Sequence, residues 1–197
     1  MSVSVLNYGA GNLKSITNLL DYIKANYQII QTRKEIEESE TLILPGVGHF
    51  GQLIDYLDTN NLKSVLIDYI KSGKPYLGIC LGLQILFESS EEAPGKKGLD
   101  VFPGKVLRFK HGKVPQIGWN KLVSCSENSL LRDDYVYFVN SYYVDTDKDS
   151  IIASKTDYYI DFVSGIQNDN LLAVQFHPEK SGKAGGEMVK RWLNHVS

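Results

Sequence analysis

The run Lys74-Pro75-Tyr76-Leu77-Gly78-Ile79-Cys80-Leu81-Gly82-Leu83-Gln84-Ile85-Leu86-Phe87 predicts an apolar strand that ends abruptly at a cysteine and continues as a helix. Glycines on both sides of Cys80 are typical of a tight bend that presents a nucleophile, because backbone and substrate approach closely there. The positive end of a helix dipole would favour the thiolate, which is the nucleophilic form. A buried structural cysteine at a packed strand end is the alternative.

A second strand end carries a histidine, in the segment Leu171-Leu172-Ala173-Val174-Gln175-Phe176-His177-Pro178-Glu179-Lys180. Catalysis by a cysteine needs a base that takes its proton and an acceptor that orients the imidazole. Cys80, His177 and Glu179 would fill these three roles, so the two strand ends together predict a catalytic triad. A histidine beside a proline is often an ordinary turn residue, but the presence of both motifs favours the triad.

A third predicted strand, Thr41-Leu42-Ile43-Leu44, opens into a loop that is rich in glycine. Exposed N–H groups in such a loop could stabilise an oxyanion, and the N–H of the residue after the nucleophile would be a second donor. The predicted oxyanion hole consists of Gly46, Val47, Gly48 and Leu81. A phosphate-binding loop or a flexible turn is the alternative, although the missing Gly-Lys-Ser/Thr excludes a Walker loop.

Composition and charge narrow the class of protein. The chain has 197 residues, 43% of them hydrophobic, which suits one domain over residues 1–197 with a substantial core. The formal net charge is −2 without a basic block, so nothing indicates a nucleic-acid or membrane partner. No apolar run approaches the ~20 residues of a membrane span. We expect a cytoplasmic protein without metal or other cofactor, since its two cysteines belong to no Cys/His cluster with metal-ligand spacing.

Hydrophobic periodicity predicts strands and helices in alternation, followed by short strands and turns. The strands are expected at 3–6, 27–32, 41–44, 75–79, 105–109, 135–139, 151–154, 162–166 and 171–174. The helices are expected at 12–22, 35–40, 52–57, 62–72, after residue 80 and at 186–194. This order predicts an α/β fold: an open, mostly parallel sheet with helices on both faces and an antiparallel extension.

The chain resembles the class I, triad-type glutamine amidotransferases, which have a flavodoxin-like fold, over essentially its whole length. The cysteine and His-Pro-Glu motifs identify this superfamily. Other segments are most similar to the glutaminase subunits of imidazole glycerol phosphate synthases: Asn7-Tyr8-Gly9-Ala10-Gly11-Asn12-Leu13, Pro45-Gly46-Val47-Gly48, Pro115-Gln116-Ile117-Gly118-Trp119-Asn120 and Tyr137-Phe138-Val139-Asn140-Ser141-Tyr142.

The resemblance implies hydrolysis of the side-chain amide of glutamine and delivery of the ammonia to a (β/α)8-barrel cyclase subunit. The two subunits would form a heterodimer that serves histidine biosynthesis. The implied glutamine-binding residues are Gln84, Glu92, Ser141 and Tyr142. The implied partner contacts are Asn12, Trp119, Tyr137 and Lys180. Capping or solvation is the ordinary alternative for Gln84 and Glu92, core packing for the two aromatic residues, and solvation for the lysine.

Some positions depart from the family pattern, and they leave the partner open. Asn140 stands where histidine is common, and Asn7 where aspartate is common. A paralogous glutaminase subunit that serves another synthase, such as one that amidates surface sugars, is therefore an alternative. A vitamin B6 pathway glutaminase is disfavoured, because its loop continues to Gly-Glu-Ser where this chain has Gly46-Val47-Gly48-His49. The complete triad argues against a non-catalytic regulatory binding module of the same fold.

Overall fold

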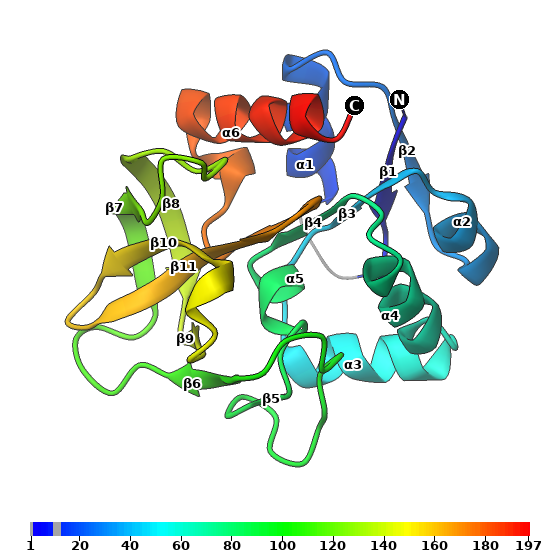
Figure 1. The fold of residues 1–197 in the computed structure, drawn as a ribbon. Helices are drawn as coiled ribbons and strands as arrows, with labels where there is room; N and C mark the ends of the chain where they lie inside the picture. The colour runs from blue at the N-terminus through cyan, green and yellow to red at the C-terminus, as the bar shows by residue number, and fades with distance from the viewer. Residues whose placement is uncertain (1, 10–12) are drawn as a thin grey trace.

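The computed structural model describes residues 2–9 and 13–197, and its N-terminal part alternates strands with helices (Figure 1). The elements in this part are β1 (Val3–Leu6), α1 (Leu13–Tyr22), β2 (Tyr27–Ile30), α2 (Arg33–Glu38), β3 (Thr41–Leu44), α3 (Phe50–Thr59), α4 (Lys63–Lys71), β4 (Tyr76–Ile79) and α5 (Leu81–Gln84). The predicted N-terminal strands and helices are thus present, with bounds shifted by a few residues.

The C-terminal part consists mainly of strands before the last helix. Its elements are β5 (Ser89–Ser90), β6 (Lys105–Arg108), β7 (Gln116–Ser124), β8 (Asp134–Asn140), β9 (Tyr142–Asp145), β10 (Ile152–Asp157), β11 (Asp161–Asn168), β12 (Leu171–Val174) and α6 (Gly182–His195). Short 3₁₀ turns lie at Asp149–Ile151 and Pro178–Lys180.

The parallel part of the sheet has the strand order β2-β1-β3-β4-β12, and β11, β10, β7 and β8 extend it as antiparallel neighbours. The first five positions have the flavodoxin-like order, in which ligands bind outside the carboxyl ends of the strands. In the register, Leu44 of β3 pairs with Gly78 of β4, and Val174 of β12 pairs with Ile79. The three strands therefore end side by side, and the segments that follow them meet at one edge of the sheet. The predicted α/β fold class is confirmed.

Helices cover both faces of the parallel strands, with α1 and α6 on one face and α3 and α4 on the other (Figure 1). Side chains along β3 alternate between two hydrophobic cores. Leu42 and Leu44 pack in the core under α3 and α4, while Ile43 packs in the core under α1 and α6. All three are almost completely buried, as expected for a strand covered on both sides.

The strand β7 was not predicted from the sequence, because its residues do not form a continuous apolar or β-branched run. Gly118 and Asn120 interrupt the pattern, and both residue types are depleted in strands. The strand forms through antiparallel pairing with β8 from Gln116 opposite Asn140 to Leu122 opposite Asp134. Tertiary pairing has therefore overridden weak local propensity. The strand β9 was also not predicted, although its Tyr-Tyr-Val run consists of residue types that are enriched in strands.

The helix after Cys80 is a single turn, shorter than the apolar run suggested. The carbonyl groups that would continue the helix accept other donors: Ile85 accepts the N–H of Leu99, and Leu86 accepts the N–H groups of Val101 and Phe102. The final helix starts at Gly182, earlier than predicted, because Gly185 can pack directly on the backbone of Pro178.

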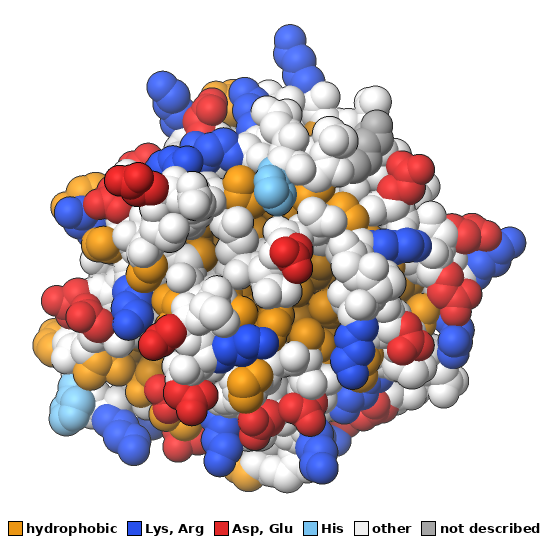
Figure 2. Space-filling view, in the orientation of Figure 1, with side chains coloured by type: hydrophobic (Ala, Val, Ile, Leu, Met, Phe, Trp, Pro, Cys, Tyr) orange, Lys and Arg blue, Asp and Glu red, His pale blue; other side chains and the backbone are white. Residues whose placement is uncertain are grey.

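The surface shows no large area of one charge on the face in view. Lys and Arg side chains are interspersed there with Asp and Glu (Figure 2), in keeping with a formal net charge of −2. Within the described ranges, no helix is both long and apolar enough to cross a membrane.

Candidate active site

The cysteine at the end of β4 occupies a backbone bend that side chains rarely tolerate. Cys80 has φ +52° and ψ −101°. The glycines beside it are needed for close backbone packing: a Cβ atom on Gly78 would overlap the carbonyl oxygen of Gly82, and one on Gly82 would overlap that of Leu44. The hydroxyl of Tyr76 also donates to the Gly82 carbonyl, at 2.8 Å. Strain of this kind costs about 1–3 kcal/mol and persists because the surrounding backbone fixes it.

The glycine-rich loop after β3 lies directly on this bend. A Cβ atom on Gly46 would overlap the carbonyl oxygen of Ile79 and the backbone nitrogen of Leu81. Gly48 has φ +117°, a conformation that favours glycine. The structure thus brings Gly46 against Leu81 at the bend of Cys80, and Val47 and Gly48 follow in the same loop, while the role of all four residues in catalysis stays a prediction.

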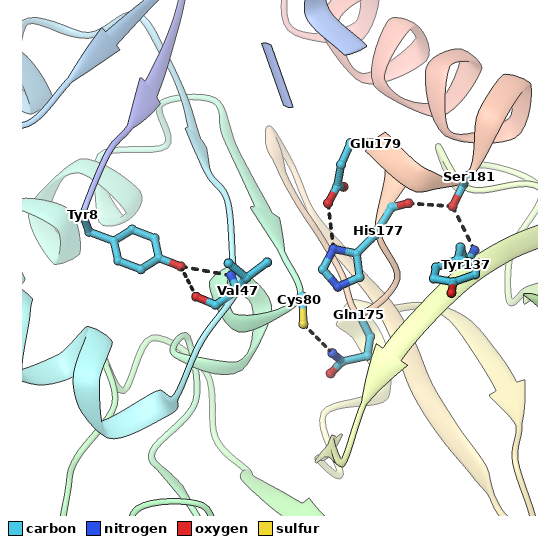
Figure 3. A network of polar contacts seen from close by, with 8 residues as sticks. All are labelled: Tyr8, Val47, Cys80, Tyr137, Gln175, His177, Glu179 and Ser181. Atoms are coloured by element: carbon cyan, nitrogen blue, oxygen red, sulfur yellow. Dashed lines mark hydrogen bonds and ion pairs between the residues drawn. The ribbon is translucent and has the colours of Figure 1, made fainter. Parts of the chain in front are cut away.

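The histidine and the glutamate lie beyond the end of β12, where the 3₁₀ turn folds the chain back. Nδ1 of His177 donates to Oε1 of Glu179 at 2.8 Å, and only 3% and 2% of their side-chain surfaces are exposed (Figure 3). The backbone of His177 is also fixed, because its N–H donates to the Tyr137 carbonyl and its carbonyl accepts the Ser181 hydroxyl. The imidazole is therefore held in one orientation.

The charge state of the histidine follows from its neighbours. Burial favours the neutral imidazole and lowers the pKa of His177, but hydrogen bonds to Cys80 and Glu179 and the negative charge of both groups outweigh it. The net effect raises the pKa of His177 to about 10. At neutral pH the imidazole is therefore protonated, and it lies in the electrostatic range of the Cys80 side chain.

A buried amide that sequence reasoning missed contacts the sulfur. Nε2 of Gln175 donates to Sγ of Cys80 at 3.4 Å (Figure 3). Oε1 of Gln175 accepts from Nε2 of Gln84 at 3.0 Å. Gln175 follows β12 directly and is completely buried. A glutamine within an apolar strand end was the available signal, because a buried amide needs partners.

The four residues expected to bind glutamine have different surroundings. Gln84 is 4% exposed, and its Nε2 donates to Gln175 and, at 3.4 Å, to the Tyr142 carbonyl. Gln84 and Tyr142 therefore belong to one polar network that reaches the sulfur of Cys80 through Gln175. The Ser141 carbonyl accepts the N–H of Phe109. Glu92 instead accepts the N–H of Phe50, the first residue of α3, at 2.7 Å. Their contacts with glutamine stay predictions.

A tyrosine that follows β1 holds the middle of the glycine-rich loop. The N–H of Val47 donates to the hydroxyl oxygen of Tyr8 at 3.1 Å, and the same hydroxyl donates to the Val47 carbonyl at 2.9 Å (Figure 3). Burial raises the pKa of Tyr8 to about 12, the Val47 hydrogen bond opposes the shift, and the negative charge of Cys80 adds to it. The hydroxyl therefore keeps its proton at neutral pH, and it occupies the Val47 N–H.

Three of the four residues expected at a partner interface lie in the part of the chain that the structure describes, and Asn12 lies outside it. Trp119 on β7 is 56% exposed and packs edge-on against the half-buried Tyr137 on β8, with ring centroids 5.9 Å apart. Lys180 is exposed. Trp119 is therefore too exposed to be a core residue, which was the alternative to a partner contact.

The described residues contain no group of three His, Cys, Asp or Glu side chains that could hold a metal ion. The arrangement is suited to nucleophilic chemistry by a cysteine that is paired with a protonated histidine.

The family described as glutamine amidotransferase class-I matches residues 4–196. Imidazole glycerol phosphate synthase subunit HisH of Methanothermobacter thermautotrophicus is 43% identical over 198 residues, which cover 98% of each protein. The chloroplastic imidazole glycerol phosphate synthase hisHF of Arabidopsis thaliana is 44% identical over 201 residues, which cover 98% of this chain and 34% of the plant protein. A solved structure described as a glutamine amidotransferase has a TM-score of 0.80 at 17% identity, with 98% of both chains covered.

The structural likeness at 17% identity shows a shared fold. The sequence relationships go further, because they extend over nearly the whole chain and include the strand ends that carry Cys80 and His177. With a family match from residue 4 to residue 196 and relatives at 43% and 44% identity, this chain belongs to the class-I glutamine amidotransferase family.

Proposed function

We propose that this protein is the glutaminase subunit of an imidazole glycerol phosphate synthase, and that Cys80, His177 and Glu179 hydrolyse glutamine to glutamate and ammonia. The observation that carries the proposal is the buried imidazole of His177, which is hydrogen-bonded to Glu179 and interacts electrostatically with Cys80, whose backbone forms a strained bend. The relative from Methanothermobacter thermautotrophicus, named as subunit HisH of that synthase, supports the choice of reaction.

In the first half of the reaction, the Cys80 thiolate attacks the side-chain amide carbon of glutamine, and a C–S bond forms. The electron pair of the carbonyl bond moves to oxygen, where backbone N–H groups of the loop and of Leu81 would stabilise the charge. The His177 imidazolium then gives its proton to the amide nitrogen as the C–N bond breaks. Ammonia leaves, and a glutamyl thioester and a neutral imidazole remain.

In the second half, the neutral imidazole takes a proton from water, and the hydroxide attacks the thioester carbon. The C–S bond breaks, and the electron pair returns to sulfur, so that the thiolate and imidazolium are restored. The carboxylic acid that leaves ionises to glutamate. Glu179 orients the ring and stabilises its positive charge. The side-chain amide of Gln175 donates a hydrogen bond to Cys80 and would hold the sulfur in position between turnovers.

We further propose that a (β/α)8-barrel cyclase subunit takes up the ammonia, in a heterodimer that serves histidine biosynthesis in the cytoplasm. Free ammonia would be lost to water unless a bound partner took it up directly. Beside Trp119 and Tyr137, the sheet face of β7 and β8 exposes Ile117 and Tyr135, each at 60%. Aromatic residues are enriched in interface cores, so this face supports the docking of a protein partner.

The experiment compares Cys80→Ala with Cys125→Ala in the complex with the cyclase subunit. Cys125 is exposed and distant in sequence from the proposed triad, so its loss should leave glutamate release within about twofold of the wild type. Cys80→Ala should abolish glutamate release but still form product from saturating ammonium salt. Full glutaminase activity in Cys80→Ala would overturn the mechanism. Failure of ammonium to restore synthesis would overturn the choice of partner reaction.

A further inference from the structure

Backbone hydrogen bonds hold Gln175 beside the sulfur of Cys80. The N–H of Gln175 donates to the Ser164 carbonyl at 2.9 Å, and the N–H of Cys80 donates to the carbonyl of Val174, the residue before Gln175, at 2.7 Å. Gln175 is also completely buried. Its side-chain amide is therefore kept next to the sulfur, to which Nε2 donates at 3.4 Å.

The orientation of this amide is determined by the groups on its other side. Nε2 of Gln84 donates to Oε1 of Gln175 at 3.0 Å and to the backbone carbonyl of Tyr142 at 3.4 Å. A backbone carbonyl can only accept a hydrogen bond, so the group of Gln84 that faces it must be the NH2 group. The oxygen of Gln175 then faces Gln84, and the NH2 group of Gln175 faces the sulfur.

A donor in this position interacts differently with the sulfur at different stages of the proposed reaction. In the glutamyl thioester the sulfur of Cys80 carries no charge and is a weak acceptor. When the C–S bond breaks, its electron pair returns to the sulfur. The same hydrogen bond then becomes charge-assisted and about twice as strong. The bond therefore favours the state in which the thiolate has left the acyl group.

We propose that Gln175 is a catalytic residue of the second half of the reaction, in which its side-chain NH2 group stabilises the sulfur of Cys80 as the thiolate leaves the glutamyl thioester. This inference rests on the proposed glutaminase function. Water gives its proton to His177 and its hydroxide to the acyl carbon, while the amide keeps both of its protons. Figure 3 shows the ring of His177 and the amide of Gln175 together beside the Cys80 side chain.

The surroundings of Gln175 favour a chemical role over a structural one. Its neighbours in the chain, Val174 and Phe176, are apolar and also completely buried. Burial of an amide costs free energy unless its groups are hydrogen-bonded, and an uncharged sulfur is a weak partner for one of them. An apolar side chain would fill the same space at a lower cost. The thiolate gives the NH2 group the strong acceptor that it otherwise lacks.

The test compares Gln175→Met with Gln167→Met in the complex with the cyclase subunit. Methionine is also unbranched and flexible, but its side chain cannot donate a hydrogen bond. Gln167 on β11 is half-buried, and its Oε1 accepts the N–H of Leu130 at 2.8 Å. Both variants thus lose one side-chain amide that is hydrogen-bonded in the same sheet, but only Gln175→Met loses a donor to the sulfur.

The substrate is the γ-(4-nitrophenyl) ester of L-glutamate, because it separates the two halves of the reaction. Its leaving group departs without taking up a proton, so the thioester forms rapidly and its hydrolysis limits the steady state. The initial burst of 4-nitrophenolate measures formation of the thioester on Cys80. The steady rate that follows measures hydrolysis of the thioester.

We expect Gln175→Met to lower the steady rate about tenfold, the factor that one charge-assisted hydrogen bond supports, and to change the burst rate by less than about twofold. Gln167→Met should match the wild type in both rates. An unchanged steady rate in Gln175→Met would overturn the proposal. Equal losses in its burst and steady rates would also overturn it, because they would show a general disturbance of the site.

A failure of the proposed function would be seen in a different measurement. If the wild type with its cyclase released no glutamate from L-glutamine, the proposed glutaminase function would fall. The ester would still show whether the amide of Gln175 assists the departure of the thiolate, because its acylation of Cys80 does not require the release of ammonia.

Discussion

The bend at Cys80 and the loop at Val47 lie against each other, but contacts of different kinds hold them. At the bend, glycine backbones pack so closely that a single added methyl group would overlap a neighbouring carbonyl oxygen. At the loop, one tyrosine hydroxyl holds both peptide groups of Val47. Backbone packing of the fold therefore positions the proposed nucleophile, whereas one side chain positions the proposed oxyanion donor.

The largest expected effect concerns His177, the proposed proton carrier beside the bend at Cys80. His177→Ala should lower kcat for glutamine hydrolysis on the order of 10²–10⁴-fold, and Glu179→Gln should lower it less, because one residue moves the proton and the other orients its carrier. Single-turnover and steady-state glutamate release in the complex measure both variants. A much greater loss in Glu179→Gln than in His177→Ala would mean that the roles are misassigned.

The second prediction tests whether backbone packing fixes the bend. Gly82→Ala should lower the free energy of unfolding by about 3 kcal/mol, because its Cβ would meet the Leu44 carbonyl. Gly73→Ala is the matched control: Gly73 has φ +77° and no atom within 4 Å of an added Cβ, so only about 1 kcal/mol of backbone strain is expected. Urea unfolding measures both. Equal losses would show that the bend has room to relax.

The third prediction concerns the glycine-rich loop that contains Val47 and Gly48. The wild-type chain alone should be a poor glutaminase, stimulated by the cyclase and further by the nucleotide ligand of the cyclase. Gly48→Ala should lower the stimulated kcat about tenfold while KM for glutamine changes little, because alanine is strained at φ +117° and restricts the loop. Steady-state glutamate release under the three conditions is the measurement. Equal wild-type rates under all three conditions would show a preformed loop.

The smallest expected effect links the imidazolium to stability. The pKa of His177 is raised in the folded state, so its contribution to stability is full below the unfolded value of 6.5 and is lost as the pH rises toward about 10. We expect the free energy of unfolding of the wild type to fall between pH 6.5 and 10, and this fall should be absent in His177→Gln. Urea unfolding at both pH values checks it. An identical pH dependence in the variant would contradict the prediction.

The fixed parts of the molecule could be predicted from the sequence, because short continuous segments encode them. A strand, a glycine-flanked cysteine and a following turn are local in the chain, and so is the return from His177 to Glu179. The alternation of strands and helices gave the parallel sheet for the same reason. The aligned ends of β3, β4 and β12 then followed from the fold class.

The side-chain hydrogen bonds that Tyr8 and Gln175 make in the site could not be predicted, because they join segments that are distant in the sequence. Tyr8 and Val47 are 39 residues apart, and Gln175 and Cys80 are 95 apart. Neither pair carries a local pattern that would indicate its partner. Glu92 was expected to bind glutamine from the family resemblance, and its hydrogen bond to the start of α3 depends on how a loop crosses that helix.

The protonated imidazole beside Cys80 also affects how readily the sulfur of this cysteine is oxidised. The pairing depends on the fold and on Glu179, so it exists whether or not a partner is bound, and Cys80 is only partly buried. A thiolate with access to solvent is the form that peroxide converts to sulfenic acid. We therefore expect peroxide to inactivate the free subunit through Cys80, and a bound partner that limits access to this sulfur to slow the loss.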